Sequence, residues 1–262
     1  SDILEDWRQG KDLYKRATAF VEGIPESQVT GEGRAFGKVV ELAAQFGLGV
    51  EGFMRTCGKW GIECDEKKAH RAIHEYYRPT HPKVVQYWWF LDRCVKGVIE
   101  NFGTTQGPLS TRMVAGMKYL FLKLPSGRQL AYPLPEMKRR PPSAKEHLEM
   151  VKGKKYPDSR FMEVTYWGQL PLSKALGRIK LHGSKLFENL VQAIAADLMA
   201  HGAIEAERCG MPPFALIHDQ GLALQEHGHT AEEFATALGK LPVWAKGLPL
   251  KVESHECNFY AK

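Results

Sequence analysis

The 262-residue sequence predicts an α+β protein, with a mostly helical part over residues 1–110 and a second part over residues 111–262 that contains an antiparallel sheet. Three observations support this prediction. Apolar residues recur at helical spacing through most of residues 1–101. From Met117 the pattern changes to short apolar runs joined by turn residues, which is typical of β-hairpins. The longest helical pattern, over residues 184–209, lies within the second part.

Helices in the first part are expected at residues 1–24, 34–46, 50–60, 65–77 and 81–101. Pro25 ends the first of these, because proline lacks a backbone N–H. Thr30 is a candidate N-cap for the second helix and Asp65 for the fourth, since their side-chain oxygens can accept from the unpaired N–H groups of a first helical turn. Gly47 and Gly49 separate the second helix from the third.

In the second part, strands are expected at residues 119–124, 128–132, 161–167, 214–217, 221–224 and 248–254, and helices at residues 184–209 and 230–238. The first two strands form a hairpin around the turn at residues 125–127. Residues 136–160 are expected to be the least ordered, because they carry eight Lys or Arg against four Asp or Glu, a local charge of +4, and several prolines. A solvated loop is favoured there over a DNA-contacting insertion.

The composition is that of an ordinary globular protein, with 44% hydrophobic and 25% charged residues. A net charge of +6 weakly favours a polyanionic partner such as nucleic acid. The five cysteines form no CxxC pair, which favours reduced thiols in the cytoplasm. There is no basic-then-apolar N-terminal segment and no run of 18 apolar residues, so neither a signal peptide nor contact with a membrane is expected.

The helix expected from residue 34 carries an unusual stripe. Arg34, Lys38, Leu42 and Phe46 recur at every fourth position, and at about 100° per residue they drift by only about 40° per step. Two cations near a helix start are disfavoured by the helix dipole, which prefers anions there. A triphosphate bound by the cations, with a base lying against the apolar pair, would compensate for this. A solvated cationic face beside a core stripe remains the alternative, and would be preferred for this helix alone.

A second candidate site is the hairpin expected at residues 214–224, whose tip is His218-Asp219-Gln220. A carboxylate held where apolar strands emerge is costly to desolvate unless a cation or a proton compensates it. Asp219 is therefore a candidate metal ligand or catalytic acid. From this stretch alone, an ordinary turn with an Asp that accepts backbone hydrogen bonds is preferred.

Together these stretches resemble family A DNA polymerases, most closely the bacteriophage members. RAFGKVVELAAQFG at residues 34–47 is similar to the fingers-helix motif in its phage form, R-x-x-G-K-x-x-E-L-x-x-x-[YF]-G. The tip at residues 218–220 resembles the third palm motif, usually His-Asp-Glu. KLFENLVQAIAAD at residues 185–197 resembles the palm helix that carries a Gln toward the primer–template minor groove. Shorter similarities at residues 124–133, 165–168 and 242–250 follow in the same order, so the resemblance covers nearly the whole chain.

The resemblance implies a nucleotide site on the fingers helix. Arg34 and Lys38 would bind the phosphates of an incoming dNTP, and Lys38 would also stabilise or protonate the pyrophosphate leaving group. Leu42 would lie against the incoming base and Phe46 beside the templating base. Gly47 would give the break that lets the end of the helix rotate on closure and would lie close to the DNA. Residues 1–110 are then the fingers subdomain and residues 111–262 part of the palm.

The resemblance also implies contacts to DNA and metal from the palm. His218 would contact the primer terminus, and Asp219 would hold the two catalytic Mg²⁺ ions. Gln192 would donate to a minor-groove acceptor that all base pairs share. The implied partners are primer–template DNA and dNTPs, in the cytoplasm of a bacterial or phage-infected host cell.

Two departures from the family pattern stand out. Gln220 replaces the usual Glu and removes one negative charge beside the metals. The first palm motif, D-Y-S-x-x-E, is absent, although residues 6–15 resemble the segment that lies shortly downstream of it. Two Mg²⁺ ions about 3.5–4 Å apart cannot be held by one Asp. The hypothesis is that an upstream polymerase subunit supplies the second carboxylate, or that the chain is a truncated product; alone it is expected to be inactive or weak.

Two other functions are weighed against a polymerase. A His-Asp metal phosphohydrolase is disfavoured, because such enzymes place the pair on a helix with further His and Asp ligands, whereas His218 follows an apolar run of strand type. The second alternative is a non-catalytic DNA-binding or accessory subunit that retains the polymerase fold. Gln220 and the missing motif favour this alternative.

Overall fold

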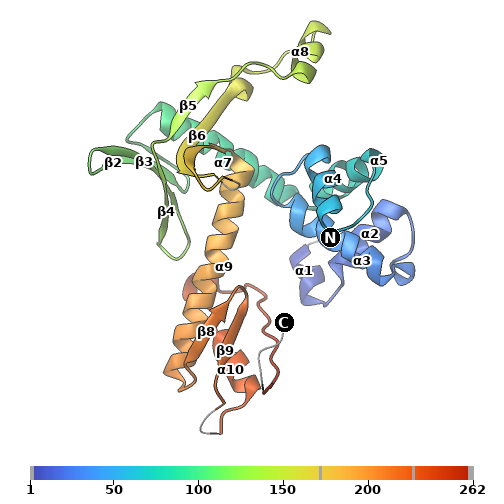
Figure 1. The fold of residues 1–262 in the computed structure, drawn as a ribbon, viewed down its shortest axis with the longest axis vertical. Helices are drawn as coiled ribbons and strands as arrows, with labels where there is room; N and C mark the ends of the chain where they lie inside the picture. Colours follow the sequence, from blue (N-terminus) through green and yellow to red (C-terminus); the bar gives the residue numbers. More distant parts are fainter. Residues whose placement is uncertain (1–2, 171–172, 226–227, 259–262) are drawn as a thin grey trace. The chain divides into compact units, whose positions relative to one another are not determined.

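The computed structural model describes residues 3–170, 173–225 and 228–258. Contacts divide the chain into two compact units, one of Ser1–Lys123 with Gln129–Leu190 and one of Leu124–Arg128 with Val191–Lys262. The fingers and palm boundary expected near residue 110 follows functional motifs rather than contacts, and it remains a prediction. The mixture of helices and antiparallel sheets confirms the α+β class (Figure 1).

Helices dominate the beginning of the first unit, as expected. Their bounds are α1 Ile3–Arg8, α2 Leu13–Glu22, α3 Gly31–Ala44, α4 Val50–Lys59, α5 Glu66–His70, a π-helical segment Arg71–Tyr77, α6 Arg78–Thr80 and α7 Pro82–Glu100. Both expected N-caps are confirmed: the Thr30 hydroxyl accepts from the Gly33 N–H, and the Asp65 carboxylate accepts from the Lys68 N–H.

The single helix expected over residues 1–24 is wrong, because the chain breaks into α1 and α2. Gly10 has a φ of +69°, in the left-handed region that glycine adopts without steric cost. Asp12 then caps a new helix by accepting from the backbone N–H groups of Tyr14 and Lys15. The break and the cap together redirect the chain into α2.

The core of the helical region lies where α2, α3 and α4 meet the π-helical segment. Its buried side chains include Val21, Phe36, Val39, Val40, Phe53, Ile73 and Tyr76. Helices α2 and α3 approach each other closely at Gly37, where an added Cβ would lie 1.9 Å from the Tyr14 carbonyl oxygen. The Thr18 hydroxyl donates to the Gly33 carbonyl at 2.6 Å and joins the same two helices.

Two antiparallel sheets complete the first unit. The strands β1 Thr105–Gln106, β2 Leu109–Val114, β3 Met117–Lys123 and β4 Gln129–Pro133 form one sheet, and β5 Glu136–Arg139, β6 Met162–Gln169 and β7 Leu176–Leu181 form the other. The expected hairpin is confirmed as β3 and β4, with buried Leu120 opposite buried Tyr132. Helix α7 lies against β1 and β2, and the Thr111 hydroxyl donates to the Val98 carbonyl on that helix.

The solvated loop expected over residues 136–160 is wrong, because much of the segment has regular secondary structure. It contains β5, helix α8 (Ala144–Val151) and a short 3₁₀ turn, Asp158–Phe161. Composition counts charges but does not show that they pair. In the structure Glu146 bonds both Arg140 and Arg160, which removes charge repulsion as a reason for disorder.

The second unit contains most of the helix α9 (Gly183–Arg208), the hairpin of β8 (Pro213–Ile217) and β9 (Gln220–Ala223), and α10 (Ala231–Leu238). Its core includes Ala206, Met211 and Ala237. The strand expected over residues 248–254 is wrong. Leu250 and Val252 instead line a groove beside α10, and a helix offers no strand edge with which this segment could pair.

Among the helices of the described residues, none is long and apolar enough to cross a membrane.

Candidate nucleotide and metal sites

The predicted stripe begins near the start of α3 and runs along the solvent-exposed face of that helix. Arg34, Lys38 and Leu42 are exposed, Leu42 by 39%, and Phe46 follows just beyond the helix as a half-buried side chain. Buried Val39 and Val40 face the core from the same turns. The helical period therefore separates the core face from a face that begins with cations and ends with apolar side chains.

Arg34 is held by a neighbouring helix. Its Nε lies 2.7 Å from Asp12 Oδ2, and its guanidinium lies 5.0 Å from the centre of the Tyr14 ring. The hydrogen bond to Asp12 raises the pKa of Arg34 above its ordinary value. Partial burial alone would raise the pKa of Asp12, but the Arg34 hydrogen bond and two backbone donors hold it below its ordinary value. Because the contact uses Nε, both terminal nitrogens can still bind a second anion.

Lys38 lies one turn further along α3. Its side chain is exposed and has no hydrogen-bond or ion-pair partner among the described residues. A positioned guanidinium and an uncompensated ammonium one turn apart form a local positive site. Such a pair is suited to a phosphate-bearing ligand.

An apolar pocket of about 310 Å³ adjoins the second half of the stripe. Its lining residues are Val39, Leu42, Ala43, Phe46, Leu48, Thr56, Trp60 and Glu188. Sequence analysis anticipated Leu42 and Phe46 but missed Trp60 and Glu188. A tryptophan at the end of the helix expected over residues 50–60 was the available signal for Trp60, whereas Glu188 reaches the pocket from α9 and has no sequence signal.

Gly47 ends this region with a φ of +76°. A Cβ at this position would lie 2.4 Å from the Ser184 hydroxyl oxygen, so both conformation and space require glycine. The structure therefore explains the residue by local geometry, and its role in helix rotation stays a prediction.

The remaining predicted residues belong to the second unit. His218 and Asp219 form the two-residue turn between β8 and β9, where Ile217 pairs with Gln220. All three tip residues are exposed, and the side chains of His218 and Asp219 have no polar partner among the described residues. His218 has a φ of +54°, which costs a non-glycine residue about 1–2 kcal/mol. A strained histidine beside an unpaired carboxylate is typical of a functional position.

Replacing His218 separates strain from side-chain chemistry. His218→Gly relieves the left-handed φ, whereas His218→Ala keeps it, and both remove the imidazole. We expect the glycine variant to be more stable than the alanine variant by up to about 1 kcal/mol. Thermal unfolding of both proteins measures this difference. Equal melting temperatures would show that the turn carries no strain.

Gln192 lies exposed on α9. Close to it, the turn at residues 124–128 is hydrogen-bonded to the same helix. Asp197 accepts from Arg128 Nε at 2.8 Å and from the Ser126 hydroxyl at 2.5 Å, and Arg128 also donates to the Ala193 carbonyl at 3.2 Å. The turn at residues 124–128 is thus tied to α9 beside Gln192. Sequence analysis assigned no role to this contact.

The described residues do not form a two-metal site by themselves. They contain no group of three His, Cys, Asp or Glu side chains that could hold a metal ion. Of the three tip residues His218, Asp219 and Gln220, only Asp219 carries a carboxylate, because Gln220 stands where the motif described above usually has Glu.

Comparison with known proteins agrees with the resemblance. No family model matches the chain. The chain is 30% identical over 271 residues to a DNA polymerase of Bacillus phage SP02, covering 98% of the chain and 38% of that protein. It also matches a structure of the POL domain of Pol1 from M. smegmatis in complex with DNA primer-template and dNTP, with a TM-score of 0.54 and 14% identity, over 97% of the chain and 34% of that domain. The chain spans little more than a third of either protein, and it is similar to each of them over nearly all of its own length.

Proposed function

We propose that this chain is part of a template-directed DNA polymerase that adds dNTPs to a primer, with α3 binding the incoming nucleotide. One observation carries the proposal: Arg34 and Lys38 form a cationic end of a stripe whose other end, Leu42 and Phe46, lines an apolar pocket. A dNTP has the matching polarity, with a charged triphosphate at one end and a flat base at the other.

The phosphate end would be bound by two different cations. The Arg34 guanidinium is oriented by Asp12 and would offer its terminal nitrogens in a fixed fork, whereas Lys38 would act as a mobile point charge. Charge-assisted hydrogen bonds of this kind are worth about 1.5–3 kcal/mol each. Lys38 would also stabilise or protonate the departing pyrophosphate.

The base end would use the pocket beside α3. Leu42 and Phe46 would contact the incoming and templating bases, and exposed Trp60 would extend the apolar surface. Gly47 would lie close to the DNA and allow the end of α3 to rotate on closure.

In the palm, Asp219 would be one ligand of the Mg²⁺ ions, which would stabilise charge on the reacting phosphate. His218 would contact the primer terminus and Gln192 the minor groove. The second carboxylate would come from an upstream polypeptide that carries the first palm motif. The hairpin itself favours a packing partner of this kind. A two-stranded sheet is only marginally stable alone, and its apolar side chains Phe214, Leu216 and Leu224 are 64%, 46% and 66% exposed.

The alternative is an accessory subunit that binds DNA and has lost catalysis. The single carboxylate at the tip favours it, since Gln220 cannot replace an acidic ligand. The cytoplasmic location expected from the cysteines applies to both functions and stays a prediction.

Lys38→Ala tests the nucleotide site. In a polymerase completed with the upstream polypeptide, we expect a higher KM for dNTP and a lower single-turnover rate, with kcat/KM falling by about 10- to 100-fold, because a charge-assisted phosphate contact is lost. Lys67→Ala is the matched control, since it removes another exposed lysine, on α5, that has no polar partner among the described residues. Unchanged KM and rate for Lys38→Ala would refute the assignment of α3.

A further inference from the structure

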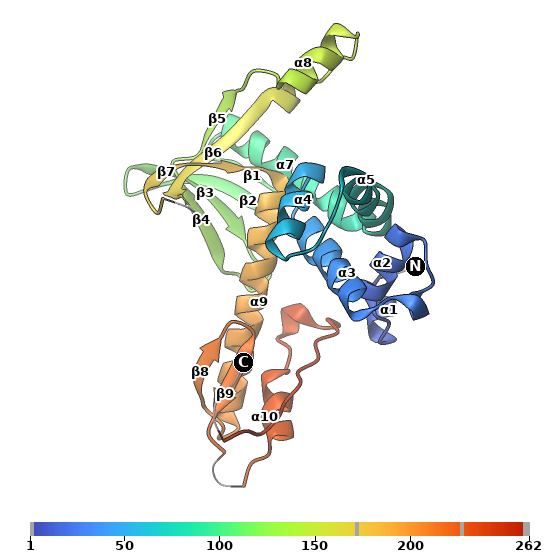
Figure 2. The same cartoon turned by 45° about the vertical axis from the view of Figure 1, so that its right-hand side comes forward.

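Helix α8 stands at the far end of β5 and β6 in two views of the first unit (Figure 1, Figure 2). It has eight residues, Ala144–Val151, and begins with a complete capping box between Ser143 and Glu146. The helix is therefore a defined element of the segment that composition alone marks as a loop.

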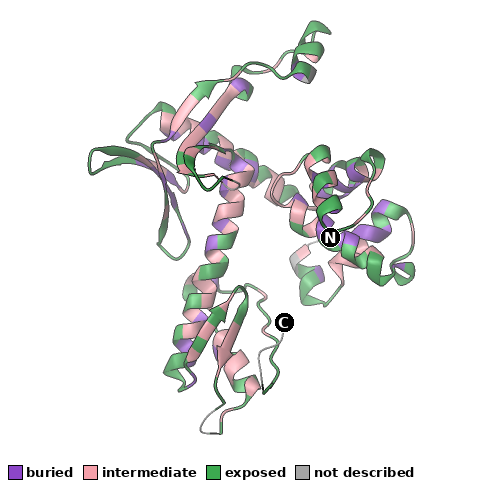
Figure 3. Ribbon diagram, viewed as in Figure 1, coloured by how far each residue is buried: buried purple, intermediate pink, exposed green. Residues whose placement is uncertain are grey.

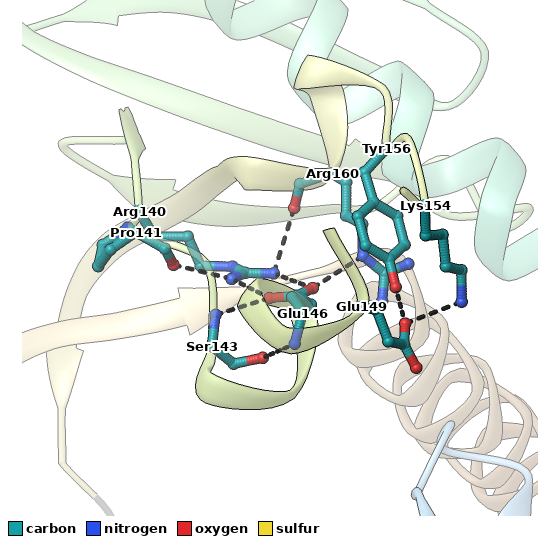
Figure 4. Close-up of polar contacts among 8 residues, drawn as sticks. All are labelled: Arg140, Pro141, Ser143, Glu146, Glu149, Lys154, Tyr156 and Arg160. Atoms are coloured by element: carbon teal, nitrogen blue, oxygen red, sulfur yellow. Dashed lines mark hydrogen bonds and ion pairs between the residues drawn. The ribbon is translucent and has the colours of Figure 1, made fainter. Parts of the chain in front are cut away.

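The side of α8 that faces its own segment is ionic (Figure 4). Glu146 is only 7% exposed and accepts two hydrogen bonds from Arg140, at 2.8 and 3.0 Å, and one from Arg160 Nε at 2.7 Å. Together with the Ser143 N–H, the Arg140 hydrogen bonds hold the pKa of Glu146 well below its ordinary range. One turn on, Glu149 accepts from Lys154 and from the Tyr156 hydroxyl.

The outward side of α8 is apolar. Ala144, Leu148 and Val151 recur at intervals of four and three residues and so share one face of the helix. Leu148 is 54% exposed and Val151 is 72% exposed, and most of α8 is drawn as exposed in Figure 3. Surface helices normally bury their apolar face and expose their polar one. In α8 the reverse holds, because Glu146 is buried whereas Leu148 and Val151 are exposed.

The charges around α8 leave an uncompensated positive end. Glu146 and Glu149 are neutralised by cations of the same segment. Lys152 and Lys155, just after the helix, are exposed and have no polar partner among the described residues. The surface offered to a partner is thus an apolar stripe with two free ammonium groups at its C-terminal end.

We propose that α8 is a docking helix for a separate protein, whose apolar groove takes Leu148 and Val151 and whose rim carries Asp or Glu opposite Lys152 and Lys155. Charge complementarity selects this occupant. A helix of eight residues is only about 12 Å long, which is short for a membrane-surface anchor. Nucleic acid offers phosphates to cations and no groove for an aliphatic stripe, and the exposed arginines Arg139 and Arg160 already bond Asp158 and Glu146.

The test begins with a photo-crosslinking amino acid in place of Leu148, in the full chain expressed in its own host. The crosslinked polypeptide is identified by mass spectrometry, purified and titrated with the chain by calorimetry. We expect a protein with an acid-rimmed groove whose affinity falls by at least about tenfold for Leu148→Ser with Val151→Ser, falls likewise for Lys152→Glu with Lys155→Glu, and weakens with added salt.

Leu176→Ser is the control, because Leu176 is another aliphatic side chain of the first unit, 75% exposed, and its loss should leave the affinity unchanged. All exchanged residues are exposed, and circular dichroism checks that each variant folds. The proposal is overturned if Leu148 crosslinks to nothing, to a second copy of the chain or to other parts of the same polymerase. It is also overturned if neither pair of variants weakens the complex, or if the wild-type chain binds phosphatidylglycerol vesicles or DNA through Leu148 and Val151 instead.

Discussion

Asp219→Asn is expected to lower primer extension by the completed polymerase by about 10³-fold or more, which corresponds to about 4 kcal/mol of transition-state stabilisation. The exchange keeps the size of the side chain but removes its charge, so the proposed metal ligand would be lost without a change in packing. Asp219 is exposed and has no polar partner among the described residues, so the fold should be unaffected. Binding of primer–template DNA, measured by fluorescence anisotropy, should change little.

Glu207→Gln is the matched control for this experiment. Glu207 lies on α9 in the same unit, and its exposed side chain has no polar partner among the described residues. Its exchange therefore also removes one negative charge, but at a residue outside the hairpin tip. It should leave extension unchanged. If Asp219→Asn also retains full extension while DNA binding persists, the accessory function becomes the better description of the chain.

The predictable parts of the fold are those specified by neighbouring residues. The hairpins of β3 with β4 and β8 with β9, the helix α3 and its Thr30 cap all follow from local periodicity and turn chemistry. The break at Gly10 was missed because the apolar pattern continues across it. The strand expected over residues 248–254 failed for a different reason: a strand needs a partner edge, and only tertiary structure shows whether one is present.

The candidate site also combines features that the local sequence predicts with features that only the tertiary structure shows. The stripe of Arg34, Lys38, Leu42 and Phe46 follows from the helical period alone, and the structure adds the pocket beside it. The contact of Arg34 with Asp12 joins residues 22 positions apart and has no local signature. For α8, charge counting predicted a solvated loop, because a sequence does not show which Arg and Glu side chains will pair.

Gly37→Ala is expected to destabilise the first unit, although alanine normally stabilises a helix interior by about 0.5–1 kcal/mol relative to glycine. At this position the new methyl group would lie 1.9 Å from the Tyr14 carbonyl oxygen and 2.8 Å from the Thr18 hydroxyl oxygen. The nearer atom belongs to the backbone of α2, so the helices themselves must separate, and overpacking of this kind costs about 1–3 kcal/mol or more.

Gly58→Ala is the matched control for Gly37→Ala, because Gly58 is an exposed glycine in α4 with no atom within 4 Å of an added Cβ. The clash should outweigh the gain in helix propensity at Gly37, while at Gly58 only the gain remains. The two variants should therefore shift the melting temperature in opposite directions, downward by several degrees for Gly37→Ala and upward slightly for Gly58→Ala, since about 1 kcal/mol corresponds to about 2–4 °C in a unit of this size. Calorimetry measures both shifts, and a Gly37→Ala protein as stable as the wild type would mean that α2 and α3 are not packed this closely. Because Lys38 is the next residue, separation of the helices should also displace its ammonium group and raise the KM for dNTP together with the loss of stability.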